Sequence, residues 1–163
     1  MKNNCSCAAD TIKKCPPDAE KIVEILRSEK RGVLSVHGEN GYPYGLPMNY
    51  WYNEENGYIY FHSGKKGHKV DAISVNQKVS FCVYDEGYKE DGEWALNISS
   101  VIVFGEIHLV EDDEKSMEIC RHLSLKYTKD VAYIEDEIRK FGGATFCFEL
   151  RPAHITGKIV KES

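Results

Sequence analysis

The fold is decided where an aromatic strand runs into a helix, in the stretch Tyr58-Ile-Tyr-Phe-His-Ser-Gly-Lys-Lys-Gly-His-Lys-Val-Asp-Ala-Ile73. Its first four residues have the aromatic and β-branched side chains typical of a strand. Val70 and Ile73, three residues apart, suit one face of a helix that begins near Gly67. A glycine-spaced basic turn therefore connects a strand to the N-terminus of a helix.

The turn between the strand and the helix predicts an anion site. Ser63 offers a hydroxyl, and Gly64 and Gly67 let bare backbone N–H groups approach a ligand at the positive end of the helix. Three lysines add positive charge: Lys65, Lys66 and Lys69. A phosphate monoester suits this turn, and a solvated lysine cluster on a surface hairpin is the open alternative. A nucleotide-hydrolase loop is excluded, because the Gly-x-x-x-x-Gly-Lys-Ser/Thr pattern is absent.

Length and composition indicate one domain. The 163 residues carry 26 acidic and 21 basic side chains, a net charge of -5, which is wrong for a protein that wraps nucleic acid. No apolar run approaches the roughly 20 residues that span a bilayer, and the N-terminus lacks the apolar core of a signal peptide. We therefore expect a cytoplasmic protein with no nucleic-acid or membrane partner, with residues 1–16 as a flexible arm and 17–163 as the domain.

The six cysteines fall into two groups. Three lie among apolar residues of expected strands or helices and are interpreted as reduced core residues: Cys82, Cys120 and Cys147. Three lie in the polar N-terminal arm: Cys5, Cys7 and Cys15. The arm could offer thiolates to a soft metal, but a fourth ligand and a C-x-x-C spacing are both absent, so no metal site is expected.

Periodicity predicts a mainly β protein with inserted helices. Helices are expected at about 18–30, 67–73, 112–127 and 131–141. Strands are expected at 33–37, 42–52, 58–61, 78–84, 96–110 and 144–150, with a last strand after Pro152. Gly105 is expected to mark a bulge, and 85–95 a flexible loop that could cover a site. Six or seven mostly antiparallel strands favour a closed barrel over a doubly wound sheet.

The strand at 42–52 alternates tyrosines with smaller residues and carries two prolines. Pro43 and Pro47 cannot donate to a ladder, which predicts an edge or bulged path. Backbone groups around Leu46 to Asn49 would then be free for a planar polar ring, whereas a proline-kinked barrel strand without a ligand is the alternative.

Four motifs in this order resemble the pyridoxamine 5'-phosphate oxidase-like flavoproteins, and most of all their nitroimidazole-resistance (Nim-type) reductase branch. They are Tyr42-Pro-Tyr-Gly-Leu-Pro-Met-Asn-Tyr50, Tyr58-Ile-Tyr-Phe-His-Ser63, Gly67-His-Lys69 and Ser100-Val-Ile-Val-Phe-Gly105. The resemblance implies a split β-barrel of the FMN-binding type, usually a homodimer, with FMN in a groove at the subunit interface.

The resemblance also implies roles for individual residues. The FMN phosphate would be held at Ser63, Lys66, Gly67 and Lys69, with His68 in the same motif. The isoalloxazine ring would lie against Leu46, Pro47, Met48 and Asn49. His62 takes the histidine position of the Phe-His-Ser motif, beside the flavin, and Ser100 matches a less distinctive cofactor position. The chain's arginines do not fall in the substrate motif of the oxidase, so vitamin oxidation is not implied.

The expected function is that of an FMN-dependent oxidoreductase. Its acceptor would be a small organic molecule such as a nitroimidazole or nitroaromatic compound, and its donor a reduced nicotinamide or another reductant. His62 would be the catalytic proton donor, although a histidine at a strand end can also serve only as a local hydrogen-bonding residue. A non-catalytic module that binds FMN or haem is the alternative.

Overall fold

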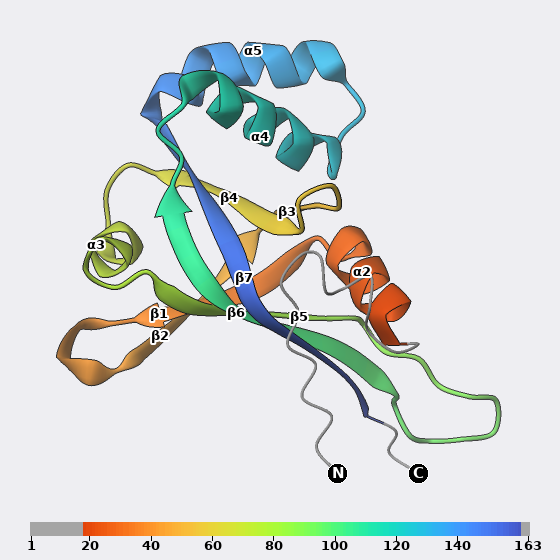
Figure 1. Cartoon of the computed structure of the whole chain (residues 1–163). Helices are drawn as coiled ribbons and strands as arrows, with labels where there is room; N and C mark the ends of the chain where they lie inside the picture. Colours follow the sequence, from red (N-terminus) through yellow and green to blue (C-terminus); the bar gives the residue numbers. More distant parts are fainter. Residues whose placement is uncertain (1–17, 161–163) are drawn as a thin grey trace.

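The computed structural model describes residues 18–160, which form one antiparallel sheet with four α-helices (Figure 1). The strands are β1 (Arg31–His37), β2 (Pro43–Asn49), β3 (Trp51–Asn53), β4 (Tyr58–Gly64), β5 (Lys78–Tyr84), β6 (Ile98–Leu109) and β7 (Thr145–Val160). The helices are α2 (Asp18–Ser28), α3 (His68–Val75), α4 (Asp113–Leu125) and α5 (Val131–Phe141), with short 3-10 turns at Glu39–Gly41 and Gly142–Ala144. The N-terminal arm and its three cysteines lie outside the described residues.

The strand order is β2-β1-β5-β6-β7-β4-β3, so consecutive strands β2 and β3 lie at opposite ends of the sheet. The prediction of one continuous strand over 42–52 is therefore wrong. The chain leaves the edge beside β1 at Asn49, passes Tyr50, and pairs with β4 from Trp51. Tyr50 is fully buried and its hydroxyl donates a hydrogen bond to the Ile25 carbonyl oxygen at 3.4 Å, which ties this crossing point to α2. The predicted edge position of Pro43 and Pro47 is confirmed, since β2 ends the sheet.

The bulge predicted at Gly105 is present, and it explains a second correction. The register of β6 against β7 pairs Phe104 with His154 but Gly105 with Pro152, so Ala153 is an extra residue in β7. The two strands predicted on either side of Pro152 are thus one continuous strand of 16 residues. A Cβ on Gly105 would lie 2.1 Å from the Arg151 carbonyl oxygen, so the bulge requires a glycine there.

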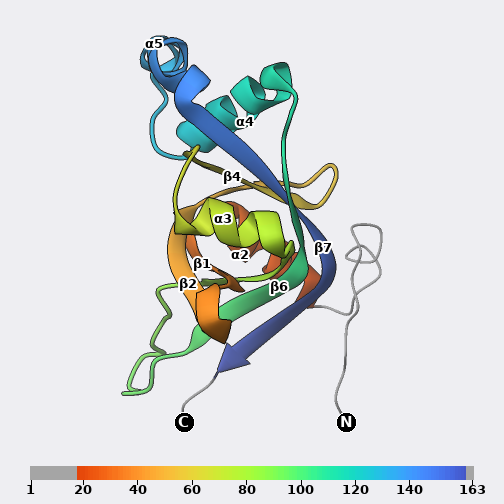
Figure 2. The same cartoon turned by 90° about the vertical axis from the view of Figure 1, so that its left-hand side faces the viewer.

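The main core lies inside the curled sheet and is closed by α2 and α3. Leu34, Phe61 and Phe81 are fully buried there, and α2 contributes Ile25 and Leu26. Figure 2 shows α3 lying across the open side of the curled sheet. Within residues 18–160, no helix has the length and apolarity needed to cross a membrane.

The α4–α5 hairpin packs outside the barrel, at the end of the sheet beyond β4 (Figures 1 and 2). Its buried contacts with the sheet form a second cluster: Tyr60, Val110, Ile119, Leu123 and Cys147. Side chains cap both helices, because Asp112 accepts a hydrogen bond from the Lys115 N–H and Asp130 from the Tyr133 N–H. The three described cysteines are free thiols as predicted, but only Cys147 is a fully buried core residue, and Cys82 and Cys120 are half-buried.

Candidate functional site

The turn after β4 presents the N-terminus of α3 to solvent. Gly67 begins the helix with φ 123° and ψ 167°, a conformation that only glycine adopts readily. The first intrahelical hydrogen bond runs from the Val70 N–H to the Gly67 carbonyl oxygen. The N–H groups of His68 and Lys69 precede that bond, so they are available to an anion at the positive end of the helix dipole.

Lys69 joins this turn to the edge strand β2. Its Nζ lies 3.5 Å from the Met48 Sδ, and the ring of the neighbouring His68 packs edge-on against Tyr44 of β2, with 4.7 Å between ring centroids. Burial lowers the pKa of the Lys69 ammonium group. The structure therefore brings together the two stretches predicted to hold a phosphate and a planar ring.

The other polar side chains of the turn differ in their exposure and in the contacts they make. Lys66 is exposed and faces solvent, whereas the Lys65 ammonium group lies 5.3 Å from the centroid of the Phe146 ring. The Ser63 hydroxyl donates a hydrogen bond to the adjacent Gly64 carbonyl oxygen at 2.9 Å. Rotation of that hydroxyl toward a ligand would break only this one local bond.

Strand alternation separates the four predicted ring-lining residues of β2. Leu46 and Met48 point to the inside of the barrel and contact the core. Pro47 and Asn49 belong to the outer face, where the Asn49 side-chain oxygen accepts a hydrogen bond from the Arg31 Nε at 3.1 Å. A planar ring beside β2 would therefore meet the backbone edge and one pair of side chains, not all four.

Ser100 is separated from the turn. It lies near the start of β6, paired with Tyr84 on one side and Lys158 on the other. It lines a cavity of about 230 Å³ beneath α2, together with Ile22, Ser99 and Gly157. Within one subunit, this residue does not join the predicted cofactor site.

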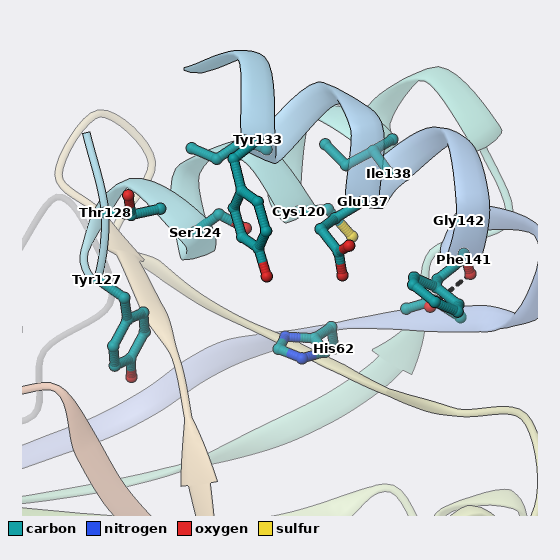
Figure 3. A pocket seen from close by; sticks show the side chains of 12 residues that line it. His62, Cys120, Ser124, Tyr127, Thr128, Tyr133, Glu137, Ile138, Phe141 and Gly142 are labelled. Carbon is teal, nitrogen blue, oxygen red and sulfur yellow. Dashed lines mark hydrogen bonds between the residues drawn. The ribbon is translucent and has the colours of Figure 1, made fainter. Parts of the chain in front are cut away.

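His62 lies on the opposite face of β4 from Ser63, as alternation along the strand requires. Its neighbour Phe61 belongs to the main core, and Tyr60, two residues away, contacts the α4–α5 hairpin. His62 lies at the base of a cavity of about 310 Å³ beneath that hairpin (Figure 3). Tyr133 and Glu137 of α5 point into the cavity toward His62, with Tyr127 and Phe141 at its sides (Figure 3).

The electrostatics of the cavity favour a neutral imidazole. Partial loss of water inside the cavity lowers the pKa of His62, although its side chain stays exposed, and the nearby Lys69 charge lowers it further. At neutral pH one ring nitrogen then carries a proton and the other can accept one. Among the described residues, no cluster of three or more His, Cys, Asp or Glu side chains is arranged to hold a metal ion.

Sequence reasoning missed the helical side of this cavity. The apolar spacing of Ile134 and Ile138 identifies the face of α5 that packs inward. Glu137 and Tyr133 flank that face, which is a weak signal that they border a buried surface. Nothing in the local pattern connects them to His62, which lies about 70 residues earlier in the chain and on another element.

Comparison with solved structures identifies the architecture. A candidate 5-nitroimidazole antibiotic resistance protein from Bacteroides thetaiotaomicron is similar, with a TM-score of 0.73 at 20% identity, over 90% of this chain and 86% of that one. An FAD binding protein from Mycobacterium smegmatis gives 0.63 at 20% identity, over 89% and 97%. A candidate pyridoxamine 5'-phosphate oxidase from Listeria innocua gives 0.61 at 20%, over 86% and 96%. These similarities confirm the predicted split β-barrel.

No curated protein matches the sequence significantly. The family model described as pyridoxamine 5'-phosphate oxidase, in contrast, matches residues 18–159, nearly the whole described chain. The chain therefore belongs to the pyridoxamine 5'-phosphate oxidase family.

Proposed function

We propose that this protein is an FMN-dependent oxidoreductase that reduces a small organic acceptor such as a nitroimidazole or nitroaromatic compound. The observation that carries the proposal is the contact of Lys69 with Met48, because it joins the N-terminus of α3, with its free N–H groups, to the edge strand β2. A flavin mononucleotide needs both features at once, a phosphate site and a flat surface for its ring. The similarity in fold to flavin-binding and nitroimidazole-resistance proteins supports the same assignment.

The residues of the turn fit a phosphate monoester. The N–H groups at the start of α3 and the ammonium groups of Lys66 and Lys69 supply charge-assisted hydrogen bonds. Gly67 has no atom within 4 Å of an added Cβ, so a ligand can reach its backbone. Ser63 would add its hydroxyl after a rotation.

The flavin, when bound, would supply the electron transfer, and the chain would bind, orient and manage protons. His62 carries one imidazole proton at neutral pH, and its position at the base of the cavity allows that ring nitrogen to donate to an acceptor. The aromatic side chains of Tyr133 and Phe141 suit a planar substrate, and the Glu137 carboxylate would accept a hydrogen bond from it.

We further propose that the active form is a homodimer joined through the outer face of the sheet. Apolar side chains lie exposed there on neighbouring strands, with Ile102 36% and Phe104 47% accessible to solvent. Cys82 and Val33 continue the same row across β5 and β1. Exposed apolar rows on adjacent strands mark an interaction surface more often than a solvated one. Light scattering tests this directly, because a monomeric mass with FMN fully bound would contradict a cofactor groove that needs two subunits.

The decisive experiment measures FMN binding and turnover separately. In the binding arm, the Lys66→Ala/Lys69→Ala variant should raise the FMN dissociation constant at least about tenfold, the equivalent of 1.4 kcal/mol. Lys65→Ala is the matched control from the same turn and should leave that constant within about twofold, because Lys65 lies over Phe146 instead. An equal effect of the two variants would remove the phosphate assignment.

In the turnover arm, the flavin is reduced anaerobically with a reduced nicotinamide or with dithionite and then mixed with a nitroimidazole. Return of the oxidised flavin spectrum supports a reductase, and His62→Ala should slow it by on the order of a hundredfold without loss of FMN. A haem spectrum, a colourless protein, or a reduced flavin that no nitro compound reoxidises would refute the proposal.

A further inference from the structure

Two thiols meet where α4 packs on β7, next to the cavity that contains His62. The Cys120 Sγ and the Cys147 Sγ are 3.7 Å apart, although 27 positions separate them in the chain. Cys147 is only 1% exposed, and its thiol also donates a hydrogen bond to the Ser116 carbonyl oxygen at 3.5 Å. The sequence predicts both cysteines as reduced core residues, and neither the proposed flavin site nor its chemistry uses them.

The separation of the two sulfur atoms is small enough for a disulfide. A disulfide bond is about 2.05 Å long, so the two sulfur atoms need to move closer together by about 1.7 Å. The two thiols are therefore in van der Waals contact, the starting separation that disulfide formation between them needs.

Only one of the two thiols is accessible. Cys120 is half-buried and lines two cavities, the one of about 310 Å³ with His62 and another of about 730 Å³ between α4, α5 and β7. Cys147 borders only the second, and its side chain is almost wholly enclosed. A small molecule that enters either cavity meets the Cys120 sulfur first.

The hydrogen bond between the thiols makes them chemically unequal. It lowers the pKa of Cys120, and the Arg121 charge acts in the same direction, while burial opposes both. The same hydrogen bond and burial raise the pKa of Cys147. Thiolates, not thiols, attack disulfides, so Cys120 is suited to react first and Cys147 to resolve the product.

We propose that Cys120 and Cys147 form a reversible redox pair, which a low-molecular-weight disulfide oxidises to an intramolecular disulfide that links α4 to β7. The Cys120 thiolate attacks one sulfur of the disulfide RSSR, whose S–S bond breaks to release one RS⁻. The Cys147 thiol then loses its proton and attacks the Cys120 sulfur, which releases the second RS⁻. Overall, RSSR and two cysteine thiols become one protein disulfide and two RSH.

His62 lies beside the redox pair. It pairs directly with Cys147 in the register of β4 and β7, and both side chains face the α4–α5 hairpin. The redox pair and the cavity residue thus share one surface, so the oxidation state of the thiols alters the wall of the cavity.

The test uses the full-length protein, with or without FMN, treated with oxidised glutathione, alkylated and digested for mass spectrometry. We expect most molecules to yield a linked peptide pair that contains Cys120 and Cys147, and dithiothreitol to restore both thiols. Peptide mapping separates this link from any formed by the N-terminal cysteines. Cys82 is the internal control, since it is half-buried on β5, away from the α4–α5 hairpin, and has no thiol partner among the described residues.

Single variants assign the order of the two steps. Cys147→Ser should stop at a mixed disulfide of glutathione on Cys120, whereas Cys120→Ser should leave Cys147 unmodified in the folded protein. A persistent mixed disulfide in the wild type, alkylation of Cys120 and Cys147 without any link, or a link that forms only in denaturant would overturn the proposal. The wild-type link requires no variant, so a destabilised mutant cannot hide the result.

Discussion

Replacing Gly67 with alanine tests whether the helix N-terminus after β4 is held in the conformation that the proposed phosphate site needs. Gly67 has φ 123° and ψ 167°, and no atom lies within 4 Å of an added Cβ. Alanine therefore fits the space but not the backbone conformation. Strain of this kind costs about 1–3 kcal/mol per residue.

That strain can lower either the stability of the fold or its affinity for FMN, and both can be measured. If the turn keeps its shape, urea unfolding should show the free energy of unfolding lowered by about 1–3 kcal/mol. If the free protein relaxes the turn, FMN binding must restore the native angle, and the dissociation constant should rise by roughly 5-fold to 150-fold, the same free energy expressed as affinity. The loss of unfolding free energy and the loss of FMN binding free energy should add up to about 1–3 kcal/mol.

Gly64→Ala is the matched control in the same turn. Gly64 also has no atom within 4 Å of an added Cβ, but it is not among the glycines with positive φ. Alanine there should leave stability unchanged or raise it by a few tenths of a kcal/mol, through a less flexible unfolded chain. If Gly67→Ala matches Gly64→Ala in both stability and FMN affinity, the argument from backbone conformation is refuted.

Two further predictions concern buried charges. Glu149 is 4% exposed, and burial alone would raise the pKa of its carboxyl group. Its carboxylate accepts hydrogen bonds from Lys115 (2.7 Å) and Arg151 (2.8 Å), and these outweigh burial and lower that pKa. Glu149→Gln should therefore lower the free energy of unfolding by about 1.5–3 kcal/mol at pH 7, and urea titrations should show the difference from wild type shrinking below pH 4.5 as the wild-type carboxylate is protonated. Burial lowers the pKa of Lys126 from 10.5 to about 8, so the unfolded chain binds more protons between those values and stability should rise with pH in that window. We expect a rise of about 1.6 kcal/mol from pH 8 to 9.5 that Lys126→Met lacks, and an equal rise in the variant would contradict this assignment.

The sequence predicted the elements well because each has a local signature. Gly67 starts α3 and Gly105 marks the bulge, since both positions impose backbone constraints that only glycine meets. Asp112 and Asp130 precede helices as capping residues do. Pro43 and Pro47 identified an edge strand because a missing N–H cannot serve a central one.

The two errors in the predicted strands arise because a local sequence pattern does not specify which strands pair. Between Met48, Tyr50 and Tyr52 the buried positions alternate without interruption, although the strand changes its hydrogen-bonding partner at Tyr50. Alternation reports which face is buried and not which strand lies alongside. In β7 the opposite happened, because the extra residue Ala153 shifts the alternation by one and imitates the end of a strand.

Strand β4 separates the two halves of the candidate site, and this explains why sequence reasoning found only one of them. Ser63 and the turn after it follow His62 directly in the chain, so their motifs could be recognised together. His62 faces the other way, toward a cavity whose remaining walls come from α4 and α5. Desolvation lowers the pKa of His62, and the Lys69 charge, from the turn that follows β4, acts in the same direction. A ligand that is to contact both halves must lie at the Gly64 end of β4, where the strand carries no side chain to separate them.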